Sequence, residues 1–181
     1  DWLGYLTAPV WQQPAEHAVV IRALALLGYS MQIYLDFAGY SDIAIGTSRL
    51  YGITIMENFR WPYLQPNISQ FWRHWHISLS DWIRDYLFFP LSQVSRAPLW
   101  GRLAVPLLAM GLCGLWHGAA WHFLLWGMWH GAGIAVHQAW NAYKRRHKIA
   151  PWRGARGRAA TAGSTVLTFA FVTVGWLLFR G

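Results

Sequence analysis

Three histidines lie in the apolar segment 114–131, which reads GLWHGAAWHFLLWGMWHG, and each is close to a tryptophan and a glycine. A neutral imidazole titrates near physiological pH and can take a proton from a hydroxyl group, so this segment is a candidate for general base catalysis. Ionisable side chains in an apolar segment are costly and usually face a cavity or a polar partner. His117 is the strongest candidate, because the motif W-H-G places it at a turn.

The helix that ends at His117 is predicted to be short. From Arg102 to His117 there are about 15 residues, or ~22 Å of helix, against a hydrocarbon core of ~30 Å. We therefore expect the turn at Trp116, His117 and Gly118 to lie below the membrane surface, where irregular backbone is tolerated only inside protein or along a wet cavity. The GxxxG spacings at 114–118 and 127–131 predict close helix packing there.

Other interpretations of these residues stay open. His117 can also be a buried histidine bonded to a carbonyl, and a structural role is favoured for His122, His130 and His137. His130 and His137 are seven residues apart and are predicted to share one helix face. Cys113 comes one turn before His117 and permits a thiol and imidazole pair, although a lone apolar cysteine is more often a small core residue.

Metal and haem sites are disfavoured. His117 and His130 are 13 residues apart, but a two-helix haem site needs a second such pair, which the sequence lacks. His74 and His76 flank Trp75 and would point apart in a helix, and there is no H-E-x-x-H motif. We therefore expect no metal ligands.

The composition indicates a membrane protein. Of 181 residues, 55% are hydrophobic and 12% charged, whereas about a quarter are charged in ordinary soluble domains. The 14 tryptophans suit interfacial belts or tunnel walls, so the net charge of +8 does not point to nucleic acid. One cysteine excludes an internal disulfide.

We expect an all-α fold of polytopic membrane helices, forming one membrane domain over 1–181 that is a fragment of a longer protein. Hydrophobic length predicts a span at 18–46, a hairpin at 99–140 that turns at His117, and a span at 163–179. The aromatic region 57–98 is predicted to lie at the cytoplasmic interface. The lysine- and arginine-rich segment 141–160 is predicted to be a cytoplasmic loop by the positive-inside rule.

One amphipathic interfacial helix is predicted within 57–98, over the sequence QFWRHWHISLSDWIRDYLFF. Asn67 or Ser69 is expected to cap it. In such a helix Trp72, His76 and Ser80 would follow one another at intervals of four residues.

Four charged residues need partners. Arg84 and Asp85 are expected to form a polar end to the interfacial helix. Asp36 and Asp42 flank Gly39 in the first span and would face one cavity only if that helix bends at the glycine. Carboxylates within a membrane are better suited to pairing with Arg or His than to acid catalysis.

Four motifs in order resemble the membrane-bound O-acyltransferase family: YLDFAGYSDIAIGTSRLYGI, ENFRWPYLQPNISQFWRHWHISLSDWIRDYLFFPL, GLWHGAAWHFLLWGMWHG and FVTVGWLLFR. The likeness covers most of 29–131 and again 169–180. It is nearest to the bacterial branch that includes the alginate O-acetyltransferase membrane subunit and the D-alanyl transfer protein of teichoic acid. That branch usually continues FFPL as PLGGN, whereas this chain reads PLSQVSRAP, and Cys113 stands where glycine is common.

The resemblance implies a ring of helices around a thin centre pierced by a tunnel, of which this chain would be an interior portion. It maps the family's essential histidine to His117 and the second, usually important histidine to His76. The further residues expected to line the tunnel or orient substrates are Asp36, Asp42, Trp72, Arg84, Asp85 and Trp116.

The implied reaction moves an acyl group, acetyl above all, from a cytoplasmic thioester donor to a hydroxyl of an exported polysaccharide such as alginate. The donor would be acetyl-CoA or an acyl carrier, acting as co-substrate with no bound cofactor. A periplasmic acetyltransferase could serve as intermediary acceptor, and the protein would cross the bacterial inner membrane several times among its lipids. Teichoic-acid D-alanyl transfer and a non-enzymatic export protein with a proton relay are the alternatives.

Overall fold

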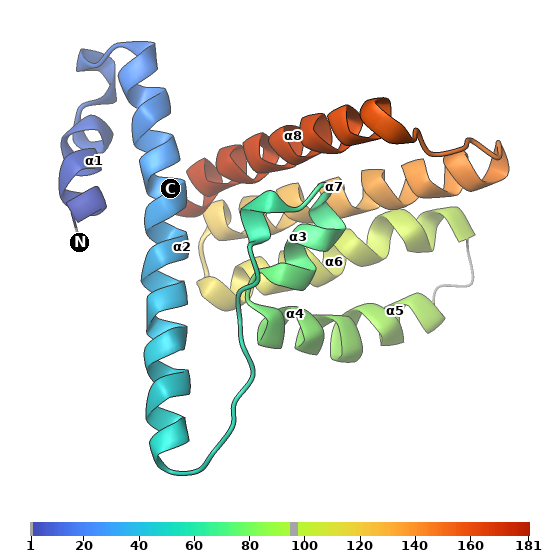
Figure 1. The fold of residues 1–181 in the computed structure, drawn as a ribbon, viewed down its shortest axis with the longest axis horizontal. Helices are drawn as coiled ribbons and strands as arrows, with labels where there is room; N and C mark the ends of the chain where they lie inside the picture. The colour runs from blue at the N-terminus through green and yellow to red at the C-terminus, as the bar shows by residue number, and fades with distance from the viewer. Residues whose placement is uncertain (1, 95–97) are drawn as a thin grey trace. The chain divides into compact units, whose positions relative to one another are not determined.

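The protein is all-α over the residues that the structure describes, 2–94 and 98–181, in a computed structural model (Figure 1). The chain forms two compact units, Asp1–Asn58 and Phe59–Gly181. Within the described ranges, extended pairing is limited to an isolated antiparallel bridge between Phe59 and Trp75. The expected helical fold class is confirmed.

The first unit is a helical hairpin of α1 (Trp2–Gln12) and α2 (Val19–Leu50), joined through a 3-10 turn at Pro14–Glu16. α1 has no counterpart among the helices predicted from the sequence. α2 runs unbroken for 32 residues and does not bend at Gly39. Asp36 and Asp42 are both exposed on it and, six residues apart, point in different directions. The bend that would have aimed both at one cavity is absent from α2.

Two described helices are long and apolar enough to cross a membrane, namely α2 and α8 (Gly154–Arg180), and Leu103–His117 is a shorter apolar segment. α8 begins nine residues before the predicted span at 163. The predicted basic loop 141–160 is correspondingly shorter, because α7 (Trp121–Arg146) continues into it. Lys144, Arg145 and Arg146 form the last turn of α7, where positive charge is favourable to the helix dipole.

The predicted continuous interfacial helix is wrong, because the chain breaks at Trp75 and His76. The segment is divided into α3 (Ile68–His74), α4 (Ile77–Ile83), a π-helical turn η3 (Arg84–Phe88) and α5 (Phe89–Val94). Trp72, His76 and Ser80 therefore do not share one helix face. Asn67 does cap α3 as expected, since its Oδ1 accepts from the Gln70 backbone N–H at 2.9 Å.

Contacts from outside the helix satisfy the carbonyls that the break leaves free. The backbone N–H of Arg60 donates to the His74 carbonyl at 3.0 Å. The Ser80 hydroxyl donates to the Trp75 carbonyl at 2.9 Å. Because the His74 and Trp75 carbonyls each keep a donor, the chain can end α3 early with Trp75 in the core.

Trp75 fills the core of the second unit. Its ring lies 5.5 Å from Phe71, 5.1 Å from Phe59 and 5.1 Å from Trp176 of α8, measured between centroids. The ring is 6% exposed. The break therefore lets the α3–α4 segment pack directly against α8.

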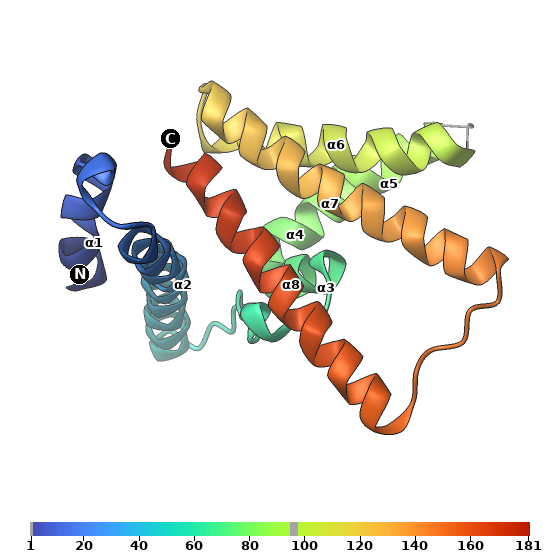
Figure 2. The ribbon, with the colours of Figure 1, turned by 90° about the horizontal axis from the view of Figure 1, so that it is seen from above.

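The longest helices of this unit are α6 (Pro98–His117), α7 and α8, and residues 118–120 connect α6 to α7. Figures 1 and 2 show that the C-terminal end of α8 returns to this connection. α6 has 20 residues, or about 30 Å of helix, and is longer than predicted. Its length alone therefore no longer places the His117 turn below the membrane surface.

Glycines allow α6 and α7 to pack backbone against backbone, as the GxxxG spacings predicted. A Cβ built on Gly127 would lie 2.1 Å from the Met110 carbonyl oxygen. One built on Gly114 would lie 2.1 Å from the Phe123 carbonyl oxygen. Neither backbone oxygen can move without separating the helices.

We predict that Gly127→Ala destabilises the protein by about 1–3 kcal/mol, because the new methyl group overpacks the interface between α6 and α7. Thermal unfolding of the intact protein in detergent measures this. The matched control is Gly163→Ala on α8, where an added Cβ meets nothing within 4 Å. The control should melt at or slightly above the wild-type temperature, and equal melting of the two variants would contradict the packing argument.

Candidate active site

His117 ends α6 and is enclosed by aromatic rings from three helices. Its ring meets Trp126 of α7 and Phe179 of α8 edge-on, at 5.3 and 5.1 Å between centroids and interplanar angles of 89° and 84°. Trp116, 64% exposed, lies 4.9 Å away, and Phe123 lies 6.1 Å away. The imidazole is half-buried, so it is held by apolar contacts and still reachable.

The turn itself is shaped by glycine and by the end of α8. A Cβ on Gly118 would lie 2.7 Å from the Phe123 ring, so a glycine is needed where the chain leaves His117. Phe179 packs on Phe123 and Trp126, with each ring pair 5.1 Å apart. The position of the His117 ring therefore depends on α8 docking against the hairpin of α6 and α7.

His76 forms the break between α3 and α4, and its backbone is left-handed, with φ 43° and ψ 60°. A residue with a Cβ pays about 1–2 kcal/mol to adopt this region, and such strain gathers at functional sites. The ring is half-buried. Burial, together with the positive charge that His117 carries when protonated, lowers the pKa of His76 to about 4.

The two predicted catalytic histidines are thus close enough for their charges to interact. They come from the α3–α4 break and from the end of α6. With its lowered pKa, His76 is uncharged at neutral pH, so it can offer one N–H donor and one acceptor nitrogen. The arrangement presents two imidazoles from separate segments to a shared region.

The other expected site residues are dispersed. Trp116 lies beside His117, and Trp72 is buried in α3, where its ring contacts Trp126 at 5.8 Å. Asp36 and Asp42 belong to the first unit.

Arg84 and Asp85 form the polar end that the sequence predicted, although on a π-helical turn. Arg84 donates from Nε to Asp85 Oδ1 at 2.8 Å and from Nη2 to Asp85 Oδ2 at 3.1 Å. It also pairs with Asp81. The hydrogen bonds from Arg84 hold the pKa of Asp85 below its usual value, and both side chains are exposed.

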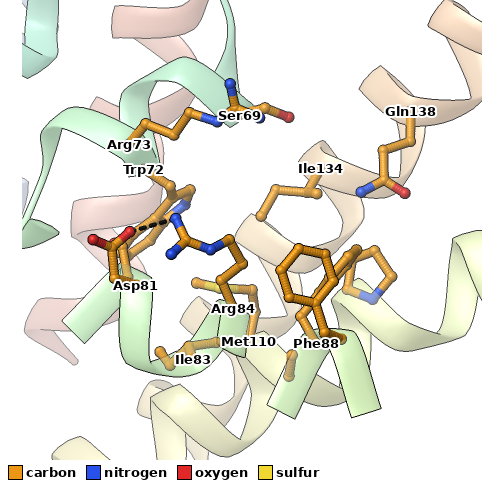
Figure 3. Close-up of a pocket in the computed structure, with 14 residues that line it drawn as sticks. Ser69, Trp72, Arg73, Asp81, Ile83, Arg84, Phe88, Met110, Ile134 and Gln138 are labelled. Carbon is orange, nitrogen blue, oxygen red and sulfur yellow. Dashed lines mark hydrogen bonds and ion pairs between the residues drawn. The ribbon is translucent and has the colours of Figure 1, made fainter. Parts of the chain in front are cut away.

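A cavity of about 230 Å³ opens between α3, α4, α6 and α7 (Figure 3). Its polar rim includes Ser69, Arg73 and the Arg84–Asp81 pair, and its floor is apolar. Neither His76 nor His117 lines it. Trp72 lines the cavity and also contacts the buried ring of His130, 5.2 Å away.

His130 and His137 share a face of α7, but their hydrogen bonds and their burial differ. His137 is bonded on both ring nitrogens, to the Ser69 hydroxyl at 2.9 Å and to Asn141 Nδ2 at 3.1 Å. His130 is fully buried among aromatic rings. Spacing within α7 could not reveal this enclosure, because most of the enclosing rings belong to α3 and α8.

Two other chemical possibilities have less support. Cys113 is 3% exposed in the packed face of α6, as expected of a small core residue. Among residues 2–94 and 98–181, no group of three or more His, Cys, Asp or Glu side chains comes together as a metal site.

Comparison with known proteins matches residues 5–165 to the membrane-bound O-acyltransferase family. The chain is 43% identical to a probable alginate O-acetylase AlgI of Azotobacter vinelandii, over 87% of this chain and 29% of that protein. It is 37% identical to a peptidoglycan O-acetyltransferase of Helicobacter pylori, over 85% of this chain and 28% of that protein.

A teichoic acid D-alanyltransferase of Bacillus subtilis is 35% identical over 87% of this chain and 40% of its own length. The chain therefore spans less than half the length of each of these relatives. The family match covers both histidine segments, and the part of α8 beyond residue 165 lies outside it. The chain belongs to the membrane-bound O-acyltransferase family.

Proposed function

We propose that the protein transfers an acyl group, acetyl above all, from a thioester donor to a hydroxyl of an exported polysaccharide. The observation that carries this proposal is the pair of histidines: the charge of protonated His117 reaches His76, and His117 is surrounded by aromatic rings. The alginate and peptidoglycan O-acetyltransferase relatives support acetyl transfer to a glycan. Family membership favours an enzyme over an export protein with a proton relay.

His117 is assigned the role of general base. Its imidazole takes the proton of the acceptor hydroxyl while that oxygen attacks the thioester carbonyl carbon. The C–S bond of the resulting tetrahedral intermediate then breaks, and the leaving thiolate receives the proton back from His117. The reaction yields an ester and a free thiol, with no net proton change.

His76 is assigned the role of hydrogen-bond donor to the thioester carbonyl oxygen. As an uncharged ring it can donate one hydrogen bond to the oxygen on which negative charge develops, which stabilises the transition state. Trp116, Trp126 and Phe179 around His117 limit the access of water, which would otherwise hydrolyse the donor.

The membrane arrangement follows from charge and length. We propose a multi-pass protein of the bacterial inner membrane, with the basic segment around 144–158 in the cytoplasm. The donor, acetyl-CoA or an acyl carrier, would then approach from that side. Because Arg84 is already paired with Asp81 and Asp85, we assign it to holding the end of α4 rather than to chemistry.

D-alanyl transfer to teichoic acid is a second candidate, supported by the Bacillus subtilis relative. The same two histidines would serve, since the reaction again attacks a thioester with a hydroxyl. A periplasmic acetyltransferase as intermediary acceptor requires no change in their roles either.

We predict that His117→Ala abolishes acyl transfer, lowering the rate by at least about 10²-fold, because the general base is lost. Acetyl ester on the exported glycan of cells that make the intact protein measures the effect. The variant should reach the membrane in wild-type amounts. Wild-type ester content would remove His117 from the mechanism.

His76→Gly and His76→Ala separate the strain at this position from its chemistry. Both should lower transfer by about 10²-fold, since both remove the hydrogen-bond donor. Glycine adopts φ 43° without strain, so His76→Gly should be more stable than His76→Ala by about 1 kcal/mol. Activity that follows the difference in melting temperature would instead assign His76 a structural role.

The acidic limb of the kcat/KM profile against pH should show the uptake of no more than one proton. His76, with a pKa of about 4, stays mostly neutral as the pH falls from 7 to about 5, so of the two rings only His117 can gain a proton in this window. A plot of log kcat/KM against pH should therefore fall toward acid with a slope no steeper than one above pH 5. A slope of two in this window would show that both rings must lose a proton.

A further inference from the structure

His130 is a buried histidine that the proposed mechanism does not use. Its exposure is 0%, and neither Nδ1 nor Nε2 has a hydrogen-bond partner among residues 2–94 and 98–181. Five aromatic rings lie within 6.2 Å of its ring centroid, namely Phe71, Trp72, Trp126, Phe171 and Trp176. Unpaired polar atoms in such surroundings destabilise the fold.

Two indole N–H groups in the same cluster are also unpaired. Trp72 Nε1 and Trp126 Nε1 are buried and have no acceptor within the described part of the chain. The three rings lie close together, since Trp72 and Trp126 are 5.2 and 5.1 Å from His130 and 5.8 Å from each other. By contrast Trp129, next to His130 in sequence, donates its N–H to the Phe171 carbonyl at 3.1 Å.

This cluster contacts two regions that a substrate would occupy, the surroundings of His117 and the cavity lined by Trp72. Trp126 touches the His117 ring, at 5.3 Å, on the reaction side. Trp72 forms part of the wall of the cavity of about 230 Å³ in Figure 3. The unpaired groups therefore lie between that cavity and His117.

We propose that Trp72, Trp126 and His130 form a hydrogen-bonding subsite beside His117 that receives an uncharged oxygen of a substrate, entering from the cavity past Trp72. The oxygen is a carbonyl oxygen of the donor or a hydroxyl of the acceptor other than the two reacting oxygens, which are assigned to His76 and His117, because two indole N–H groups and an imidazole suit either. A charged group would be costly to bury among these rings. The subsite rests on the proposed function and adds the residues that hold the substrate.

Substitutions in this subsite should lower activity without a matching loss of stability. Replacing an unpaired buried polar group by an apolar one of similar volume is close to neutral for folding or stabilising. His130→Leu in the intact protein keeps a similar volume and should therefore melt at or above the wild-type temperature in detergent. Trp126→Phe and Trp129→Phe lose the same core volume, so Trp126→Phe, which loses no hydrogen bond, should be the more stable of the two. The kcat/KM of His130→Leu and of Trp126→Phe should fall about tenfold, the size expected for one lost hydrogen bond. His130→Gln keeps polar atoms and should recover part of this loss.

Trp129→Phe is the matched control. It removes an indole N–H that is bonded within the protein, so it should lower the melting temperature and leave kcat/KM near the wild-type value. The reverse pattern, with His130→Leu less stable than the wild type, Trp126→Phe less stable than Trp129→Phe and both fully active, overturns the subsite. If His130→Leu fails to accumulate, Trp126→Phe and His130→Gln carry the same comparison.

Steady-state kinetics of the variants, with acetyl-CoA and a glycan oligosaccharide as probes, show which of the two substrates supplies the oxygen. A raised KM for acetyl-CoA assigns the subsite to the donor, and a raised KM for the oligosaccharide assigns it to the acceptor. Wild-type kinetics in His130→Leu beside an inactive His117→Ala overturns the subsite alone. Full activity of His117→Ala overturns the proposed function itself.

Discussion

The backbone contact between α6 and α7 is the constraint on which the rest of the site depends. Gly114 and Gly127 leave no room for a side chain between the two helices, so the hairpin closes with only residues 118–120 between them. His117 is the last residue before that connection. Its place, its distance from Trp126 and the fit of Phe179 from α8 all follow from how closely the two helices approach.

The aromatic rings then join segments that are distant in sequence. Trp176 of α8 contacts Trp75 at the α3–α4 break and Trp126 of α7, so one ring couples the two histidine-bearing segments. Such packing holds His76 in a left-handed conformation that isolated sequence would avoid. The aromatic contacts of the surrounding core offset the strain of this left-handed residue.

Several features could be predicted because they depend on local rules. The helical fold class follows from composition and apolar lengths, the Asn67 cap from side-chain chemistry, and the α6–α7 contact from glycine spacing. The break at His76 could not be predicted in this way, because the helical periodicity of the sequence continues through it. The break depends on tertiary contacts. The Arg60 N–H donates a hydrogen bond to the His74 carbonyl, and Trp75 packs against the ring of Trp176.

The enclosure of His130 was hidden for the same reason. Spacing placed it with His137 on one face of α7, yet their surroundings differ because α3 brings Ser69 to His137 and aromatic rings to His130. For Asp36 and Asp42 the expectation of a shared cavity depended on a bend at Gly39. α2 runs unbroken through that residue, and both carboxylates are exposed on it.

A structure of the intact protein with a ketone analogue of the acyl donor, in which a methylene group replaces the thioester sulfur and the carbonyl is kept, tests the central claim most directly. The carbon of that carbonyl should lie between His117 and His76, with its oxygen within about 3 Å of an imidazole nitrogen. An analogue whose reactive end stays among Arg73, Arg84 and Gln138 in the cavity, away from both histidines, would contradict it.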